Sequence, residues 1–266
     1  EGRGLILFCQ LDVTGRTETD PVAETLARRL IDHALSWRPS PARAVVYAGA
    51  EEGRRHLASI GIPAASILEE RPSDRHLLVV GPGAAGELSG PAGSGWREWM
   101  ARGGVVAAAG LDAGDLGLLP GRWPTVRLEE HVSTVFPPPA GNSAFAGIGP
   151  ADVHNRDPRV VPLVAAGPTG AVLGNGVMAS DGAVTLFQLA PWRFASAHQM
   201  NLRRTHRRLA VAFNRWLGNL GAAGTTPLLE RFSRPVRPEP KESRWLEGLY
   251  LDRPEEWDDP YRFFRW

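Results

Sequence analysis

The sequence predicts an α/β fold, with a parallel sheet that carries helices on both faces. Short apolar runs typical of buried strands alternate with stretches of helical periodicity, and Gly or Pro residues separate them. One strand–loop–helix unit occurs twice, near residues 5–38 and 184–220. The 266 residues, 43% of them hydrophobic and 22% charged, are enough for one large or two small globular domains.

The repeated unit begins with two similar strands, 5–8 and 184–187, which lead into Gln10 and Gln188. A polar loop follows each strand, and then a helix whose apolar residues are spaced by three and four. Both helices contain Arg-Arg-Leu, at 28–30 and at 207–209. The apolar positions are Ala23, Leu26, Ala27, Leu30, Ile31 and Ala34 in the first helix, and Leu209, Ala212, Phe213, Trp216, Leu217 and Leu220 in the second.

Residues 1–38 are expected to be the last strand and helix of an α/β domain whose other elements are missing from this sequence. A buried parallel strand needs neighbours on both sides, and one strand with one helix cannot form a sheet. Left alone, the strand 5–8 would be an exposed sheet edge that promotes association. The alternative is a chance likeness between two short strands.

A second α/β domain is predicted over residues 41–224, after a Pro-Ser-Pro connector at 39–41. The second copy of the repeat closes this domain. Residues 126–136 and 161–178 are typical of β-hairpins around Gly174-Asn175-Gly176, an Asn-Gly turn signal. The other strands are expected at 44–47, 65–68, 77–80 and 105–109, and the other helices at 51–60 and 96–101.

The segment 225–266 differs in composition from the rest of the chain. It is rich in Pro and Arg, and three of the nine Trp residues lie in its last 22 positions. So dense an aromatic segment is expected to pack as an extended arm, on its own domain or on another one.

The overall charge argues against two classes of partner. Thirty basic residues balance 29 acidic ones, so the net charge of +1 favours neither nucleic acid nor an anionic lipid surface. No apolar run approaches the ~18 residues of a membrane span. The single cysteine, Cys9, cannot form an internal disulfide and indicates no redox compartment; as part of a longer protein the chain is compatible with a secreted or periplasmic location.

The most polar segment, 146–159, contains the first candidate binding residues: His154, Asn155, Arg156 and Asp157. Together these side chains are suited to binding a sugar. We expect no metal there, because no second His or carboxylate stands at ligand spacing on a helix. An ordered loop held by its own hydrogen bonds is the alternative.

Two more candidates follow the repeated strands. Asp12 comes after the first strand and Trp192 after the second, and α/β folds bind ligands at the carboxyl ends of their strands. The indole of Trp192 is suited to stacking on a sugar ring, and covering the sheet edge is the alternative for it.

The stretch GPGAAG at 81–86 matches the pattern G-x-G-x-x-G and follows a strand. A dinucleotide site needs a helix that begins within this motif, and the next residues, ELSGPAGSG, are poor helix formers. We therefore expect a flexible loop and no nucleotide cofactor.

Two other groups are predicted to have no catalytic role. Cys9 lies within a strand, not on the sharp strand-to-helix turn where a nucleophile stands. The carboxylates of the tail, Glu255, Glu256, Asp258 and Asp259, have no scaffold to fix the separation of about 5–10 Å that glycosidases need.

Several segments together resemble the C-terminal part of large bacterial β-galactosidase-like proteins. Those proteins belong to the neighbourhood of glycoside hydrolase families 2 and 42, and they carry domains with the class I glutamine amidotransferase-like, flavodoxin-like fold. The segments are GRGLILFCQLDVTGRTETDPVAETLARRLI, GIGPADVHNRDPR, VTLFQLAPWRF with RRTHRRLAVAFNRWLGNLG, and GLYLDRPEEWDDPYRFFRW.

The resemblance implies a non-catalytic module with a structural or oligomerising role and a carbohydrate-facing surface. In active amidotransferases a Cys in a tight elbow attacks glutamine, helped by His and Glu, and the corresponding loop here, GPGAAG, has no Cys. In family 42 enzymes the equivalent domain takes part in trimer formation, and the catalytic glutamates lie on a barrel domain that nothing here resembles. The implied partners are the rest of the parent polypeptide, further copies of the chain and carbohydrate, with no cofactor. The alternative function is a glycoside hydrolase for β-galactoside-like substrates in its own right.

Overall fold

The computed structural model describes residue 7 and the ranges 15–38, 42–119, 126–165, 171–196, 198–222 and 224. These residues form two compact units, one that ends at Ala42 and one that begins at Arg43. The predicted strand 5–8, Cys9, Asp12, the connector 39–41 and the arm 225–266 lie outside the described residues, apart from Leu7.

The first unit contains one helix, α1 (Pro21–Ser36). Asp20 caps it, since its Oδ1 accepts the backbone N–H groups of Val22 at 2.9 Å and Ala23 at 3.4 Å. Pro21 occupies the first turn, where a missing N–H does no harm. An ion pair between Glu24 and Arg28, 2.7 Å apart, adds support one turn further on.

The second unit is built on a mixed sheet of seven strands. Five parallel strands lie in the order β2 (Ala64–Ser66), β1 (Ala44–Ala48), β3 (His76–Val80), β4 (Val105–Ala109) and β9 (Val184–Phe187). Two antiparallel strands, β8 (Met178–Asp181) and β7 (Ala171–Leu173), continue the sheet beyond β9. The predicted α/β class is confirmed.

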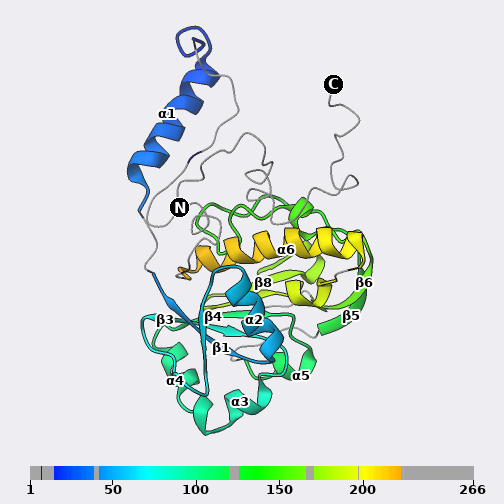
Figure 1. The fold of residues 1–266 in the computed structure, drawn as a ribbon. Coiled ribbons are helices and arrows are strands. Elements are labelled where there is room, and N and C mark those ends of the chain that lie inside the picture. The colour runs from blue at the N-terminus through cyan, green and yellow to red at the C-terminus, as the bar shows by residue number, and fades with distance from the viewer. Residues whose placement is uncertain are drawn as a thin grey trace, which may run out of the picture. The chain divides into compact units, whose positions relative to one another are not determined.

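Helices cover both faces of this sheet (Figure 1). One face packs against α2 (Glu51–Ser59) and α6 (Met200–Asn219). The other packs against α3 (Ala85–Ser89), α4 (Trp96–Ala101) and α5 (Ala113–Leu116). The strands are apolar on both sides, as parallel strands between two helical layers must be.

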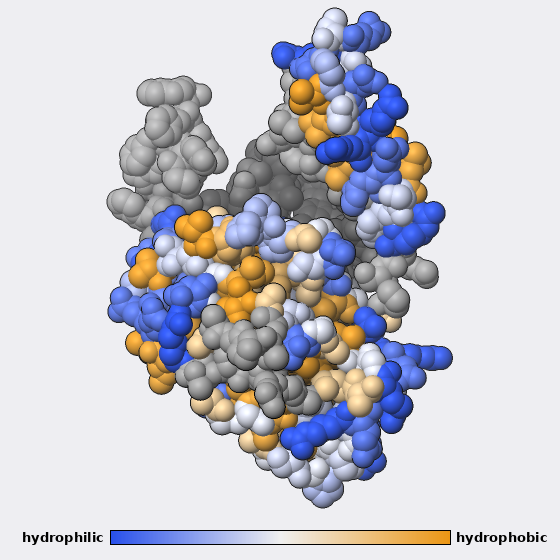
Figure 2. All heavy atoms as spheres, turned by 180° about the vertical axis from the view of Figure 1, so that it is seen from behind, coloured by the Kyte–Doolittle hydropathy of each residue, from blue (hydrophilic) through white to orange (hydrophobic). Residues whose placement is uncertain are grey.

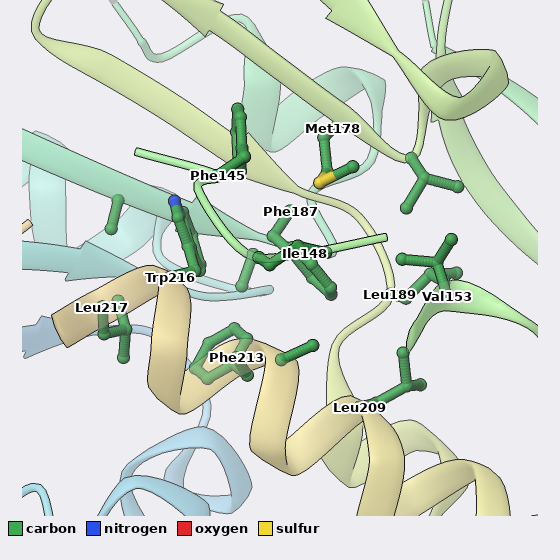
Figure 3. Packing of buried hydrophobic residues seen from close by; sticks show 14 of the residues in the cluster. Phe145, Ile148, Val153, Met178, Phe187, Leu189, Leu209, Phe213, Trp216 and Leu217 are labelled. Atoms are coloured by element: carbon green, nitrogen blue, oxygen red, sulfur yellow. The ribbon is translucent and has the colours of Figure 1, made fainter. Parts of the chain in front are cut away.

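Several of the largest fully buried side chains pack beneath or on α6. Phe213 and Trp216 project from α6 toward Phe187 of β9 (Figure 3), with ring centroids 6.0 and 5.7 Å from that phenyl ring. The buried indole of Trp216 donates its N–H to Oγ1 of Thr185 at 3.1 Å, so its polar atom is satisfied. The second copy of the sequence repeat is thus a strand and the helix that lies on it.

A second, two-stranded sheet pairs β5 (Val126–His131) with β6 (Arg159–Val164). The predicted Asn-Gly turn is present as η3 (Gly174–Gly176), where Asn175 has a φ of 55° between β7 and β8. Residues 161–164 pair with β5 across the chain and not across this turn. Three more short 3₁₀ helices are η1 (Pro91–Gly93), η2 (Pro150–Val153) and η4 (Pro191–Phe194).

The expectation of a flexible loop at 81–86 is wrong, because α3 begins within GPGAAG at Ala85. Leu88 of this short helix is buried in the core cluster, and Glu87 is hydrogen-bonded to Gly49. Tertiary contacts thus hold a helix that its Gly- and Ser-rich sequence does not favour. Among the described residues, no helix has the length and apolarity that a membrane span requires.

Candidate functional site

A pocket of about 520 Å³ opens at the carboxyl ends of β1 and β3. In the order β2–β1–β3–β4–β9, these are the two neighbouring strands from which the chain proceeds in opposite directions across the sheet. Such a switch point is where open α/β sheets bind ligands. The pocket is lined by Tyr47, Gly49, Ala50, Glu51, Arg54, Ser66, Leu68, Glu69, Gly83 and Glu87.

Tyr47 forms the floor of the pocket. Its hydroxyl donates to the carbonyl oxygen of Ala50 at 2.9 Å. A Cβ added at Gly53 or Gly81 would lie 2.0 or 2.2 Å from the Tyr47 Oη, so two glycines leave the space that the phenol fills. Burial, and next the nearby Glu87 carboxylate, raise the pKa of Tyr47 far above its ordinary value.

The turn after β3 is the sharp strand-to-helix turn on which a nucleophile would stand. Its central residue, Gly83, has a φ of 81°, and a Cβ there would meet no atom closer than the Ala50 nitrogen at 3.9 Å. The backbone N–H of Gly83 donates to Oδ2 of Asp115 at 3.0 Å, which fixes the turn to α5. The position that would carry a nucleophilic side chain therefore carries none.

The backbone donor in the adjacent turn, after β1, is already occupied. Gly49 follows β1 and donates its N–H to Oε2 of Glu87 at 2.8 Å. An incoming oxyanion would have to displace this carboxylate. The same carboxylate lies in the first turn of α3, where a dinucleotide site would need room for phosphate.

An ion pair between Glu51 and Arg54, in the first turn of α2, lies at the outer rim of the pocket. The guanidinium of Arg54 contacts both carboxylate oxygens of Glu51, with N–O distances of 2.8 and 3.0 Å. These hydrogen bonds lower the pKa of Glu51 and raise that of Arg54. Both side chains are solvent-exposed, so this pair contributes little to stability.

The six residues after β9, the strand that closes the parallel set, include no carboxylate, His, Cys or Lys. The residues there are Gln188, Leu189, Ala190, Pro191, Trp192 and Arg193. Gln188 is fully buried, and its amide forms two hydrogen bonds with the backbone of Leu111, in the loop after β4. The Gln188 side chain therefore joins the loops after β4 and β9, and it is not a group that transfers protons.

Three of the predicted residues in segment 146–159, namely His154, Asn155 and Arg156, form hydrogen bonds with α6. Asn155 is 1% exposed, and its Oδ1 accepts the Asp157 N–H at 3.1 Å and the Thr205 hydroxyl at 3.3 Å. Arg208 donates to the carbonyl oxygen of His154 at 3.2 Å. The Arg156 side chain is exposed, and its backbone N–H donates to Thr205 Oγ1. These contacts match the ordered loop that the sequence offered as the alternative.

Trp192 lies in an aromatic cluster between η4, α2 and α6, and it does not line the pocket. Its ring centroid is 5.6 Å from that of His56 and 5.7 Å from that of Phe213. Burial, and next the neighbouring His206, lower the pKa of His56 to about 4, and the buried Nε2 of His56 has no hydrogen-bond partner. The described part of the chain holds no group of three or more His, Cys, Asp or Glu that could bind a metal ion.

The structure does not bring the predicted site residues together. Trp192 and the segment with Asn155 contact different parts of α6, and Asp12 lies outside the described residues. The sequence did not indicate the pocket residues Tyr47 and Glu87, nor Asp115, which accepts the N–H of Gly83 behind them. The glycines at 49, 53 and 81 were the available signal, because glycines after two strands and in the intervening helix indicate a close approach.

Comparison with protein-family models and with curated proteins finds no match. Among solved structures, one chain of PurLQS from Thermotoga maritima aligns over 68% of this chain and 100% of its own length. The sequence identity is 11% and the TM-score is 0.42. A likeness of this size carries no argument about family or activity, and the α/β class rests on the strand order itself.

Proposed function

We propose that residues 43–222 are a non-catalytic, amidotransferase-like module of a larger, glycoside hydrolase-like protein. Its role there is structural or oligomerising, with a surface that faces carbohydrate. The resemblance of four sequence segments to β-galactosidase-like proteins is the first support. The second support is the order of the parallel strands, β2–β1–β3–β4–β9, because this is the flavodoxin-like order.

One observation supports the proposal that this module is not catalytic. The turn after β3 keeps the shape of a nucleophile elbow, with positive φ at Gly83 and a helix directly after it, but no nucleophile is present. The donor that would stabilise an oxyanion, the N–H of Gly49, is held by the chain's own Glu87. A turn without a nucleophile, beside a Gly49 N–H that Glu87 occupies, is not equipped to hydrolyse glutamine by the covalent route.

The function as a glycosidase in its own right gains no support from the two carboxylates of segment 146–159, Asp152 and Asp157. Asp152 accepts the N–H of Gly149 at 2.8 Å and caps η2. Asp157 lies 4.0 Å from Arg159 in an exposed pair. Both carboxylates already have structural contacts, and neither lines the pocket.

The test is an activity panel on the purified 266-residue chain. Glutamine and a set of nitrophenyl glycosides are offered to it, and to the polypeptide from the complete natural reading frame. A commercial glutaminase and a β-galactosidase serve as positive controls. We expect glycoside turnover by the complete polypeptide and none by the 266-residue chain.

Turnover of a glycoside by the 266-residue chain, abolished by Asp157→Asn or Glu255→Gln, would overturn the proposal and make this chain an enzyme. Release of ammonia from glutamine by the chain would overturn it as well. If the complete polypeptide turns over no glycoside, the part of the proposal that places this module in a glycoside hydrolase-like protein fails.

A further inference from the structure

Strand β5 has a long free edge. It has six residues and, within the described part of the chain, pairs with β6 alone. The edge strands of the larger sheet, β2 and β7, have three residues each. The backbone of β6 lies against η3, since a Cβ added at Gly176 would lie 2.2 Å from the carbonyl oxygen of Val164. A free edge presents a row of unpaired N–H and C=O groups, so β5 has room for a partner strand.

Two apolar side chains are exposed on one face of this small sheet. Leu128 is 72% exposed and Val160 is 64% exposed. They lie on the same face, because Val160 is directly opposite Glu130, which follows Leu128 by two positions. Figure 1 places β5 and β6 at one side of the second unit, and on that side Figure 2 shows apolar groups at the surface next to strongly hydrophilic ones. This apolar strip has no cover among the described residues.

The residues on either side of Leu128 carry opposite charges. Arg127 and Glu129 point to the other face of β5 and form an ion pair with each other. The Arg127 guanidinium also donates to the carbonyl oxygen of Asn175 at 3.1 Å. The two side chains remain 41% and 47% exposed, so a strand beside β5 can reach both. The edge therefore has the order positive, apolar, negative, which is complementary to its own reverse.

This order selects one register for an antiparallel pair of two β5 strands. The backbone groups that face outward belong to alternate residues, so a symmetric pair must be centred on a single residue. Centred on Arg127 or on Glu129, the pair would place two like charges directly opposite each other, which is destabilising. Centred on Leu128, it places Arg127 opposite Glu129 of the partner subunit on both sides of the two-fold axis. The two exposed leucines then lie opposite each other.

We infer that two copies of this chain associate through β5, paired antiparallel and centred on Leu128. The two small sheets become one sheet in the order β6–β5–β5–β6, and Leu128 is covered by Leu128 of the partner subunit. Val160 continues the apolar strip on the neighbouring strand. A second copy is the occupant because the edge is complementary to itself, which is the condition for a closed two-fold interface. The inference rests on the proposed function only in that it gives the oligomerising role a surface.

Sedimentation equilibrium of the 266-residue chain is the first test. We expect a mass of twice 28.8 kDa at high protein concentration, and of 28.8 kDa after dilution. A chain that remains a monomer at its highest soluble concentration would overturn the inference. The mass does not depend on any activity, so a dimer that hydrolyses glycosides would overturn the proposed function and support this inference.

A single cysteine locates the contact, because Leu128 lies opposite itself in the proposed pair. Opposite Cβ atoms in an antiparallel pair are about 5 Å apart, which is close to the separation in a disulfide. In a Cys9→Ser background, oxidation should convert Leu128→Cys to a covalent dimer about tenfold faster than Leu68→Cys. Leu68 is the matched control, since it is 61% exposed and lines the pocket. Equal rates for the two variants would contradict a contact through β5.

Charge reversal tests the register. Arg127→Glu and Glu129→Arg each place like charges opposite each other and should raise the dissociation constant of the dimer about tenfold. The double variant restores opposite charges and should return this constant to within about threefold of the wild-type value. Arg28→Glu, which breaks an exposed ion pair on α1, is the control and should leave the constant unchanged. Single variants without effect, or a double variant as weak as the single ones, would contradict the register.

Discussion

The side-chain amide of Gln188 forms two hydrogen bonds with the backbone of Leu111, accepting its N–H at 3.0 Å and donating to its carbonyl oxygen at 2.9 Å. All four groups are buried, so this pair joins the loops after β4 and β9 without help from solvent. The interaction makes a specific prediction about stability.

Gln188→Leu should lower the free energy of unfolding by about 3 kcal/mol, because it leaves a buried N–H and a buried carbonyl without partners. Urea denaturation monitored by tryptophan fluorescence measures the loss. Gln199→Leu is the matched control, since Gln199 is exposed and makes no capping hydrogen bond. A loss below ~0.5 kcal/mol for Gln188→Leu would show that the pair is dispensable.

Gly81→Ala should destabilise the fold by about 3 kcal/mol, because the new methyl group would lie 2.2 Å from the Tyr47 Oη. Gly86→Ala adds the same group where no atom lies within 4 Å, and in a helix it should be neutral or mildly stabilising. A double-mutant cycle with Tyr47→Phe should show coupling, because that change removes the closest atom. Additive losses would contradict the packing described for Tyr47.

His56 should make the chain less stable in mild acid. Its pKa is about 4 in the folded chain, against an ordinary value of 6.5, because burial disfavours the charged ring. The unfolded chain therefore binds the proton first, and stability present above pH 6.5 is lost as the pH falls toward 4. Between pH 7 and pH 5 this contribution is about 2 kcal/mol.

The variant His56→Phe should lose about 2 kcal/mol less than the wild type over that interval, as measured by urea midpoints at the two pH values. His33→Phe, at an exposed position of α1, is the control and should keep the wild-type dependence. If the free energy of unfolding depends on pH in the same way in the wild type, His56→Phe and His33→Phe, then His56 is not buried in its neutral form.

Tyr47 should not ionise while the chain is folded. Its raised pKa means that the unfolded chain loses this proton first, so stability falls as the pH rises above ~10. After a rapid jump to about pH 11, the fast rise in tyrosinate absorbance should be equal in the wild type and in Tyr47→Phe. Only the wild type should then show a further rise, at the rate of unfolding. A larger fast rise in the wild type would show that the phenol is accessible.

Asn155→Ala should act on stability, with a loss of about 2 kcal/mol, because the Asp157 N–H and the Thr205 hydroxyl lose their shared acceptor. Arg156→Ala, next to it and exposed, should change stability by less than ~0.5 kcal/mol. Thermal unfolding of both variants measures the difference. An unchanged melting temperature for Asn155→Ala would contradict a stabilising contact between segment 146–159 and α6.

The elements that were predictable from the sequence have strong local patterns. β1, β3, β4 and β9 are runs of apolar residues bounded by polar or glycine residues, and α2 and α6 have clear helical spacing. The Asn-Gly turn at Asn175 was also recognisable, because few residues other than Gly accept a positive φ. In each case the information lies within about ten residues.

The features that were missed depend on residues far apart in the sequence. Helix α3 is held by Glu87, whose partner Gly49 lies 38 residues away, and local composition alone disfavours it. Asn155 has the side chain of a binding residue, yet its partner Thr205 is 50 residues away and satisfies it. Tyr47 is typical of a strand residue, and only the positions of Gly53 and Gly81 make it the floor of a pocket.

The hydrogen bond between Glu87 and Gly49 also bears on how this fold can evolve. A cysteine at position 83 would place a thiol at the centre of the turn after β3. That mutation would strain a residue whose φ is 81°, and the donor that the thiol chemistry requires would still be held by Glu87. A single substitution therefore costs stability and leaves the Gly49 donor occupied, so a thiol site at this turn would need at least two changes, one at Gly83 and one at Glu87.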